Sequence, residues 1–143
     1  MTQLIPHIIC ADAARAIEFY TRAFGAVEQM RLPGRDGKLM HAAVRIGESM
    51  LMLVDENPAW GALGPLALKG TPVTLHLQVS DADAVVAQAV AAGAKLSMPV
   101  QEMFWGDRYG QVEDPFGHRW SVATQVRQLS MEQIREAAAK AGA

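Results

Sequence analysis

The chain carries the same pattern of residues twice, and this repeat constrains its fold more than any other feature. His7 precedes Asp12 and a helical segment, and His76 precedes Asp81 and a second helical segment. His76 lies 69 positions after His7, and Asp81 lies 69 positions after Asp12. A strand–helix unit that recurs at a fixed offset indicates two modules built to one plan. We therefore expect any site to be built between the halves.

The bulk properties exclude several classes of partner. The 143 residues suffice for one domain with a core, and 13 Lys and Arg against 15 Asp and Glu give a net charge of −2 with no basic run. This balance argues against nucleic acid or an anionic membrane as partner. No segment approaches the roughly 20 apolar residues of a membrane helix, and the N-terminus lacks the features of a signal peptide. The single cysteine, Cys10, favours burial and a reducing cytoplasm.

Strand and helix patterns divide the chain into four segments. Each module has the order β-α-β-β-β, which predicts an α+β fold. Asp12 is expected to cap the first helix, a Ser80–Asp83 pair the second, and a capping box at Ser130 the last. The segments are module one (residues 4–56), a Gly- and Pro-rich connector (57–71), module two (72–125) and an Ala-rich helical tail (129–143).

One face of each predicted sheet is polar. Side chains alternate across a strand, so His76 and Gln78 share one face while Leu75 and Leu77 share the other. His7 occupies the corresponding polar face in module one. If the two sheets curl toward each other, these faces would line a small-molecule pocket. The strand residues expected to bind a ligand there are His7, His41, Arg45, Met52, His76, Gln78 and Ser121.

The segment from Trp105 to Gly110 is a candidate ligand-facing loop. Trp105 would supply an aromatic wall and Arg108 a contact for an anion, and the two glycines would allow close approach. The alternatives are a hairpin that packs Phe104 and Trp105 on the core, and a solvated Asp107–Arg108 ion pair of little energetic value.

Two motifs together resemble a known family. The run from Asp12 to Tyr20 with Phe24-Gly25, and the run Glu-Asp-Pro-Phe-Gly-His at 113–118, resemble the glyoxalase/bleomycin-resistance/dioxygenase family of the vicinal oxygen chelate superfamily. The resemblance covers about residues 4–125. Trp-Gly-Asp-Arg-Tyr-Gly at 105–110, with Met-His-Ala ahead of Met-Leu-Met-Leu, is most similar to the PhnB-like branch.

This resemblance implies paired βαβββ modules in a cup-shaped, barrel-like arrangement of eight strands, usually a homodimer. Metal-dependent members carry His or Gln on the first strand of each module and a carboxylate on the last. The corresponding positions here are Ile5, Thr74, Met52 and Ser121. None of these is an ordinary ligand of a catalytic divalent metal, so no metal or other cofactor is favoured. A displaced metal site would have to use His7, His41 and His76.

Three functions follow as hypotheses. The leading one is a cytoplasmic homodimer that binds a small organic molecule between its modules and sequesters it without chemistry. The second is a metal-dependent lyase, isomerase or dioxygenase, in which a divalent ion chelates vicinal oxygens and stabilises an enolate. The third is a non-catalytic interaction module that assembles through a sheet edge and the Ala-rich tail. Whether the chain is an enzyme is left open at this stage.

Overall fold

The computed structural model describes residues 1–142 and confirms an α+β fold of two βαβββ modules. Ala143, the last residue of the predicted tail, lies outside the described residues. Module one contains β1 (His7–Cys10), α1 (Ala13–Phe24), β2 (Val27–Pro33), β3 (Leu39–Ile46) and β4 (Ser49–Asp55). Module two contains β5 (Thr74–Gln78), α3 (Ala82–Ala92), β6 (Lys95–Glu102), β7 (Asp107–Glu113) and β8 (Arg119–Gln125). The connector holds η1 (Pro58–Trp60) and α2 (Pro65–Leu68), and the tail holds α4 (Met131–Ala141).

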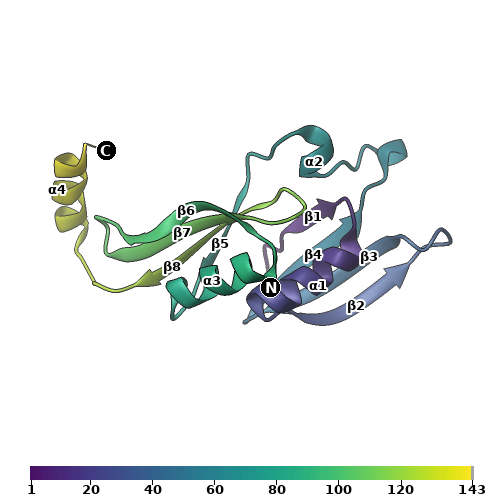
Figure 1. Ribbon diagram of the computed structural model, residues 1–143, viewed down its shortest axis with the longest axis horizontal. Helices are drawn as coiled ribbons and strands as arrows, with labels where there is room; N and C mark the ends of the chain where they lie inside the picture. Colours follow the sequence, from purple (N-terminus) through teal and green to yellow (C-terminus); the bar gives the residue numbers. More distant parts are fainter. Residues whose placement is uncertain (143) are drawn as a thin grey trace.

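The eight strands form two separate four-stranded sheets with the same topology. Their strand orders are β1-β4-β3-β2 and β5-β8-β7-β6. In each sheet the first and last strands of the module pair in parallel, and His7 opposite Met52 matches His76 opposite Ser121. The sheets lie side by side along the long axis of the molecule, and α1 packs against α3 between them (Figure 1). The duplication read from the sequence is thus present in the backbone.

An aspartate caps the N-terminus of the helix in each module. Asp12 accepts the amide of Arg15 at 3.1 Å at the start of α1, as expected. At α3 the predicted Ser80–Asp83 pair is wrong, because Asp81 occupies the cap and accepts the amide of Ala84 at 3.1 Å. The aspartate that repeats Asp12 after 69 residues performs the same local task in the second module.

The core lies where the helices meet the sheets and continues across the two modules. Phe24 of α1 and the buried Trp120 of β8 have ring centroids 4.7 Å apart. Cys10 of β1 is also buried, as predicted. His118 Nε2 lies 2.8 Å from the carbonyl oxygen of Ile9, which adds a polar contact between the modules. These cross-module contacts hold the two halves of one chain as a unit.

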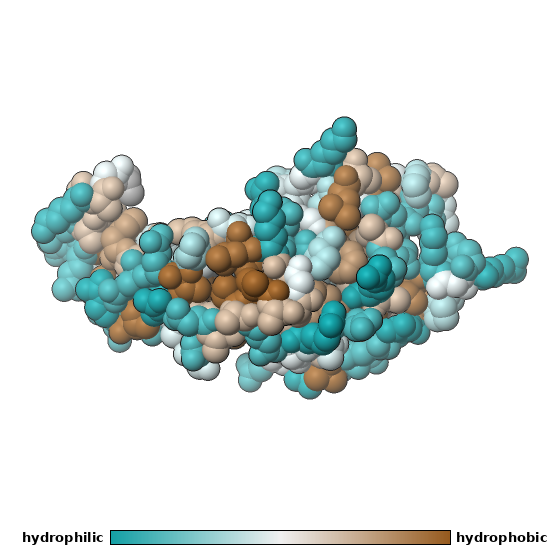
Figure 2. Space-filling view, viewed as in Figure 1, coloured by the Kyte–Doolittle hydropathy of each residue, from teal (hydrophilic) through white to brown (hydrophobic). Residues whose placement is uncertain are grey.

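The tail helix α4 stands apart from both sheets at one end of the molecule, and the connector lies toward the other end (Figure 1). None of the residues in α4 is buried. Its predicted capping box is present, since Ser130 and Gln133 bond reciprocally at the first turn. An apolar patch covers the region of α3 on the visible face, while the outer side of α4 is hydrophilic (Figure 2). No helix among residues 1–142 has both the length and the apolar character needed to cross a membrane.

Candidate functional site

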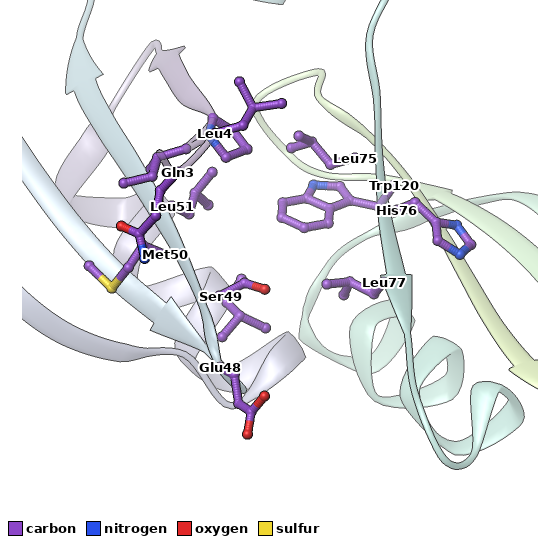
Figure 3. Close-up of a pocket in the computed structure, with 13 residues that line it drawn as sticks. Gln3, Leu4, Glu48, Ser49, Met50, Leu51, Leu75, His76, Leu77 and Trp120 are labelled. Atoms are coloured by element: carbon purple, nitrogen blue, oxygen red, sulfur yellow. The ribbon is translucent and has the colours of Figure 1, made fainter. Parts of the chain in front are cut away.

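A pocket of about 380 Å³ lies at the seam between the modules. Leu75, Leu77 and Trp120 of module two point into it toward Leu51 of module one, so its walls are largely apolar (Figure 3). These side chains belong to the helix-covered faces of the two sheets. His76 also borders this pocket, but its ring points away from it (Figure 3). The halves of one chain therefore enclose a pocket between them, with a lining different from the predicted polar set.

The open face of each sheet, meaning the face without a helix, points away from the seam. The sulfur of Met50 and the ring of His76 extend in opposite directions from the seam pocket (Figure 3). His7 lines two pockets beside the connector, one of which also includes Leu75 and His118 of module two, and neither includes His76. The structure thus keeps the two predicted histidine faces apart within one chain, and a shared cup would need a second copy.

On the open face of module two, His76 is held at both ring nitrogens. Nδ1 lies 2.7 Å from Ser121 Oγ, and Nε2 lies 2.9 Å from Gln78 Oε1. A carboxamide oxygen only accepts, so Nε2 carries the hydrogen and Nδ1 accepts from the serine hydroxyl. The structure brings these three predicted residues together. With both nitrogens engaged, the flat side of the imidazole is the part left to contact a ligand.

Two aromatic rings extend this cluster. The Tyr109 ring stacks on His76 with centroids 6.2 Å apart and planes 17° apart, and Trp105 meets Tyr109 edge-on at 5.7 Å. Gln111 Nε2 donates to Tyr109 Oη at 2.9 Å, which fixes the phenol. Tyr109 and Gln111 were missed at the sequence level, although strand alternation places both on the same face as Ser121, whose cross-strand partner is Gln111.

The open face of module one carries a smaller cluster. His7 and His41 meet edge-on with ring centroids 5.6 Å apart, and Met52 pairs with His7 across β1 and β4. A pocket of about 520 Å³ opens beside His7 toward the connector, and exposed Met40 and Trp60 line it. Trp60 was not among the predicted site residues. The available signal was a tryptophan within a Gly- and Pro-rich connector.

The two predicted arginines lie elsewhere. Arg45 Nη1 donates to the carbonyl of Gly47 at 2.8 Å in the turn after β3. Arg108 donates to both carboxylate oxygens of Asp83 on α3, at 2.7 and 2.9 Å, so it extends toward the helix-covered face. This hydrogen bond lowers the pKa of Asp83, and the same bond raises the pKa of Arg108. Arg108 is thus separated from the His76 cluster, and a ligand contact by it stays a prediction.

A family model described as the glyoxalase/bleomycin resistance protein/dioxygenase superfamily matches residues 4–122. The chain belongs to this superfamily. Among its relatives is the uncharacterized protein Rv0887c of Mycobacterium tuberculosis (strain H37Rv), which is 48% identical over 142 residues, covering 97% of this chain and 84% of that protein.

Solved structures agree with this membership of the glyoxalase superfamily. TioX from Micromonospora sp. ML1 superposes with a TM-score of 0.69 at 27% identity, covering 87% of this chain and 99% of TioX. A PhnB protein from Bacillus cereus superposes with a TM-score of 0.67 at 16% identity, covering 86% of this chain and 99% of that one. At this identity the PhnB likeness establishes the glyoxalase fold alone.

The residues at the metal positions of the glyoxalase superfamily do not fit a catalytic divalent ion. Ile5 and Met52 offer no hard or borderline donor, and Thr74 and Ser121 offer neutral hydroxyls. Among residues 1–142, no three His, Cys, Asp or Glu side chains are grouped so that they could hold a metal. The chain therefore departs from the superfamily's metal-dependent members in its donor set.

Proposed function

We propose that this member of the glyoxalase superfamily binds a planar organic molecule and sequesters it without chemistry. The ligand would lie on the open face of module two, which contacts the open face of module one from a second copy. A homodimer of this kind forms two equivalent cups, because a two-fold axis repeats every contact. The Trp-Gly-Asp-Arg-Tyr-Gly motif at 105–110 supports placing the chain in the PhnB-like branch.

The His76–Tyr109–Trp105 cluster is the observation that carries this proposal. Stacked and edge-on rings on an exposed sheet face present a flat surface to conjugated compounds, and aromatic pairs contribute about 0.5–1.5 kcal/mol each beyond the area that they bury. The hydrogen bond from Ser121 Oγ to His76 Nδ1 and the one from His76 Nε2 to Gln78 Oε1 fix the orientation of the imidazole. Such preorganisation reduces the entropic cost of binding.

The need for a second copy follows from the direction of the open faces. Each presents an exposed histidine to solvent. Within one chain, Met50 of module one and His76 of module two extend in opposite directions (Figure 3). A small-molecule site usually encloses most of its ligand, which a single exposed face does not do. The His7–His41 pair of a second copy would supply the opposite wall.

Calorimetry with full-length protein tests the proposal directly. The probes are 9-aminoacridine, anthraquinone-2-sulfonate and bleomycin, which together sample a planar cation, a planar anion and a compound named in the superfamily's description. We expect at least one to bind, and Tyr109→Ala and Trp105→Ala each to weaken binding about 2- to 10-fold. Arg15→Ala is the matched control, because Arg15 is exposed on α1, away from the open face of module two, and the variant should leave binding unchanged.

Three results would reject the proposal. They are binding of none of the three probes, equal binding by wild type and both aromatic variants, and a protein that sediments as a monomer at micromolar concentration. Elemental analysis of the same preparation distinguishes sequestration from the alternative of a metal-dependent enzyme. Stoichiometric Zn, Fe, Mn or Ni would favour the metal-dependent class over sequestration.

A further inference from the structure

Within residues 1–142, the tail helix α4 buries none of its side chains against another element. It contains 11 residues, none of them buried, and isolated helices shorter than about 12–15 residues are marginal in water. The capping box at Ser130 and Gln133 favours the helix but contributes only about 1 kcal/mol. A helix of this length normally gains its stability from packing of an apolar face.

The helix does present such a face. Met131, Ile134 and Ala138 follow helical spacing along one side, and Met131 is 60% exposed. Glu136 and Lys140 lie on the opposite side by the same helical spacing. The arrangement is that of an amphipathic helix that fits an apolar groove.

Module one has a partly apolar pocket that matches the apolar side of α4. The pocket of about 520 Å³ beside the connector is lined by Trp60 and Met40, which are 80% and 57% exposed. Its lining also carries the carboxylates of Asp36, Asp55 and Glu56 against the single ammonium group of Lys38, so acidic groups outnumber basic ones. Arg135 flanks the apolar side of α4, so the charges of helix and pocket are complementary.

The pocket that α4 occupies must belong to another copy of the chain. Only residues 126–130 separate β8 from α4, and five extended residues span about 17 Å at most. The start of this segment is fixed, since the amides of Val126 and Arg127 donate to the carbonyl of Gly106 at 2.9 and 3.0 Å. The connector lies alongside module one, and the sheet of module two separates it from α4 (Figure 1).

We infer that α4 docks into the Trp60–Met40 pocket of a second copy and there closes the rim of the proposed cup. This inference rests on the proposed face-to-face homodimer, in which β8 of one copy already lies over module one of the other. The tail continues directly from β8, so the docked helix extends the same interface. Because the tail bonds to Gly106, docking also holds the neighbouring Trp105 in place.

Cysteine cross-linking tests the inference in the full-length chain. The native Cys10 is fully buried, so it should not interfere. A chain with Ile134→Cys is mixed with a chain with Trp60→Cys under mild oxidation. We expect a disulfide-linked heterodimer, identified by mass spectrometry of the joined peptides. The control replaces Ile134→Cys by Ala139→Cys, on the hydrophilic side of α4, and should cross-link at least 5-fold less.

A second pair of variants measures the contribution to assembly. Ile134→Glu and Ala139→Glu introduce the same residue on opposite sides of α4. Sedimentation equilibrium should show the dimer dissociation constant rising at least 10-fold for Ile134→Glu and less than 2-fold for Ala139→Glu, with equal helix content by circular dichroism.

The possible failures are distinguishable. A dimer that gives no link between positions 134 and 60, or equal links from positions 134 and 139, would overturn the docking of α4 and leave the proposed function standing. A monomeric wild-type chain would overturn both.

Discussion

Tyr20 Oη donates to Asp114 Oδ2 at 2.5 Å, joining α1 of module one to the turn before β8 of module two. The same carboxylate oxygen accepts Trp120 Nε1 at 2.9 Å, and Oδ1 accepts the amides of Phe116 and His118 at 2.9 and 3.0 Å. Asp114 is 3% exposed, so four donors satisfy a buried charge. The Asp-Pro-Phe-Gly turn is thus a structural joint between the modules.

Removing this joint should destabilise the protein in a graded way. Tyr20→Phe deletes one hydrogen bond to a charged acceptor and should lower the free energy of unfolding by about 1.5–3 kcal/mol. Asp114→Ala leaves four donors without their acceptor and should cost more, about 3–5 kcal/mol. Urea denaturation measures both. Glu18→Ala, at an exposed position of α1, is the control and should be nearly silent; equal midpoints for all three variants would refute the assigned role.

Because Tyr20 donates to Asp114 as a neutral phenol, the free energy of unfolding should fall at alkaline pH. Burial, and then the charge of Asp114, raise the pKa of Tyr20 well above its ordinary value of about 10. A raised folded-state pKa gives stability that is complete below pH 10 and is lost as pH rises through the folded pKa, at about 1.4 kcal/mol per pH unit. The difference in unfolding free energy between wild type and Tyr20→Phe should therefore shrink above pH 10. A difference that grows with pH would contradict the linkage.

Much of the fold could be predicted because local chemistry determines it. The 69-residue repeat reappears as two sheets of identical topology, and Asp12 caps α1 as expected. The predicted Ser80–Asp83 cap is wrong, because Asp81 is the residue that repeats Asp12 and it caps α3 in the same way. Where the two signals disagree, the internal repeat is the better guide.

The candidate site was predictable only in part. Alternation along the strands correctly placed His76, Gln78 and Ser121 together, because the side-chain period of a strand is fixed. It could not say whether the two open faces meet, because that depends on how α1 packs against α3. Arg108 was assigned to the loop by its neighbours in the sequence, whereas an acceptor 25 residues away on α3 determines its direction.

In each module, one side chain accepts the backbone amide of the first residue of the helix, and the two acceptors lie at equivalent positions of the repeat. Asp55 accepts the amides of Ala13 and Leu39 at 2.8 and 2.6 Å, while Thr124, 69 positions later, accepts the amide of Ala82 at 2.7 Å. Asp55→Ala should therefore lower the free energy of unfolding more than Thr124→Val, by about 2–4 kcal/mol against about 1–2 kcal/mol.

Urea denaturation of the two single variants and the double variant checks this order. The two acceptors lie in different modules, so their effects should add within about 0.5 kcal/mol. Thr124 also donates to the carbonyl of Val79 at 2.9 Å, so both residues make two hydrogen bonds. A larger effect for Thr124→Val would contradict the idea that a carboxylate is the stronger acceptor at this position.

Adding a single methyl group at Gly106 should disturb both the tail and the Trp105 loop. Its φ is +100°, and a Cβ there would lie 2.4 Å from the carbonyl oxygen of Arg127, so Gly106→Ala adds a backbone clash to left-handed strain. Hydrogen exchange should show faster exchange of the Val126 and Arg127 amides, which bond to Gly106, and calorimetry should show weaker binding of aromatic probes. Gly37→Ala is the matched control, because its φ is +82° with open space around the added Cβ. Equal exchange at residues 126 and 127 in both variants would show that the tail is held by something other than the Gly106 carbonyl.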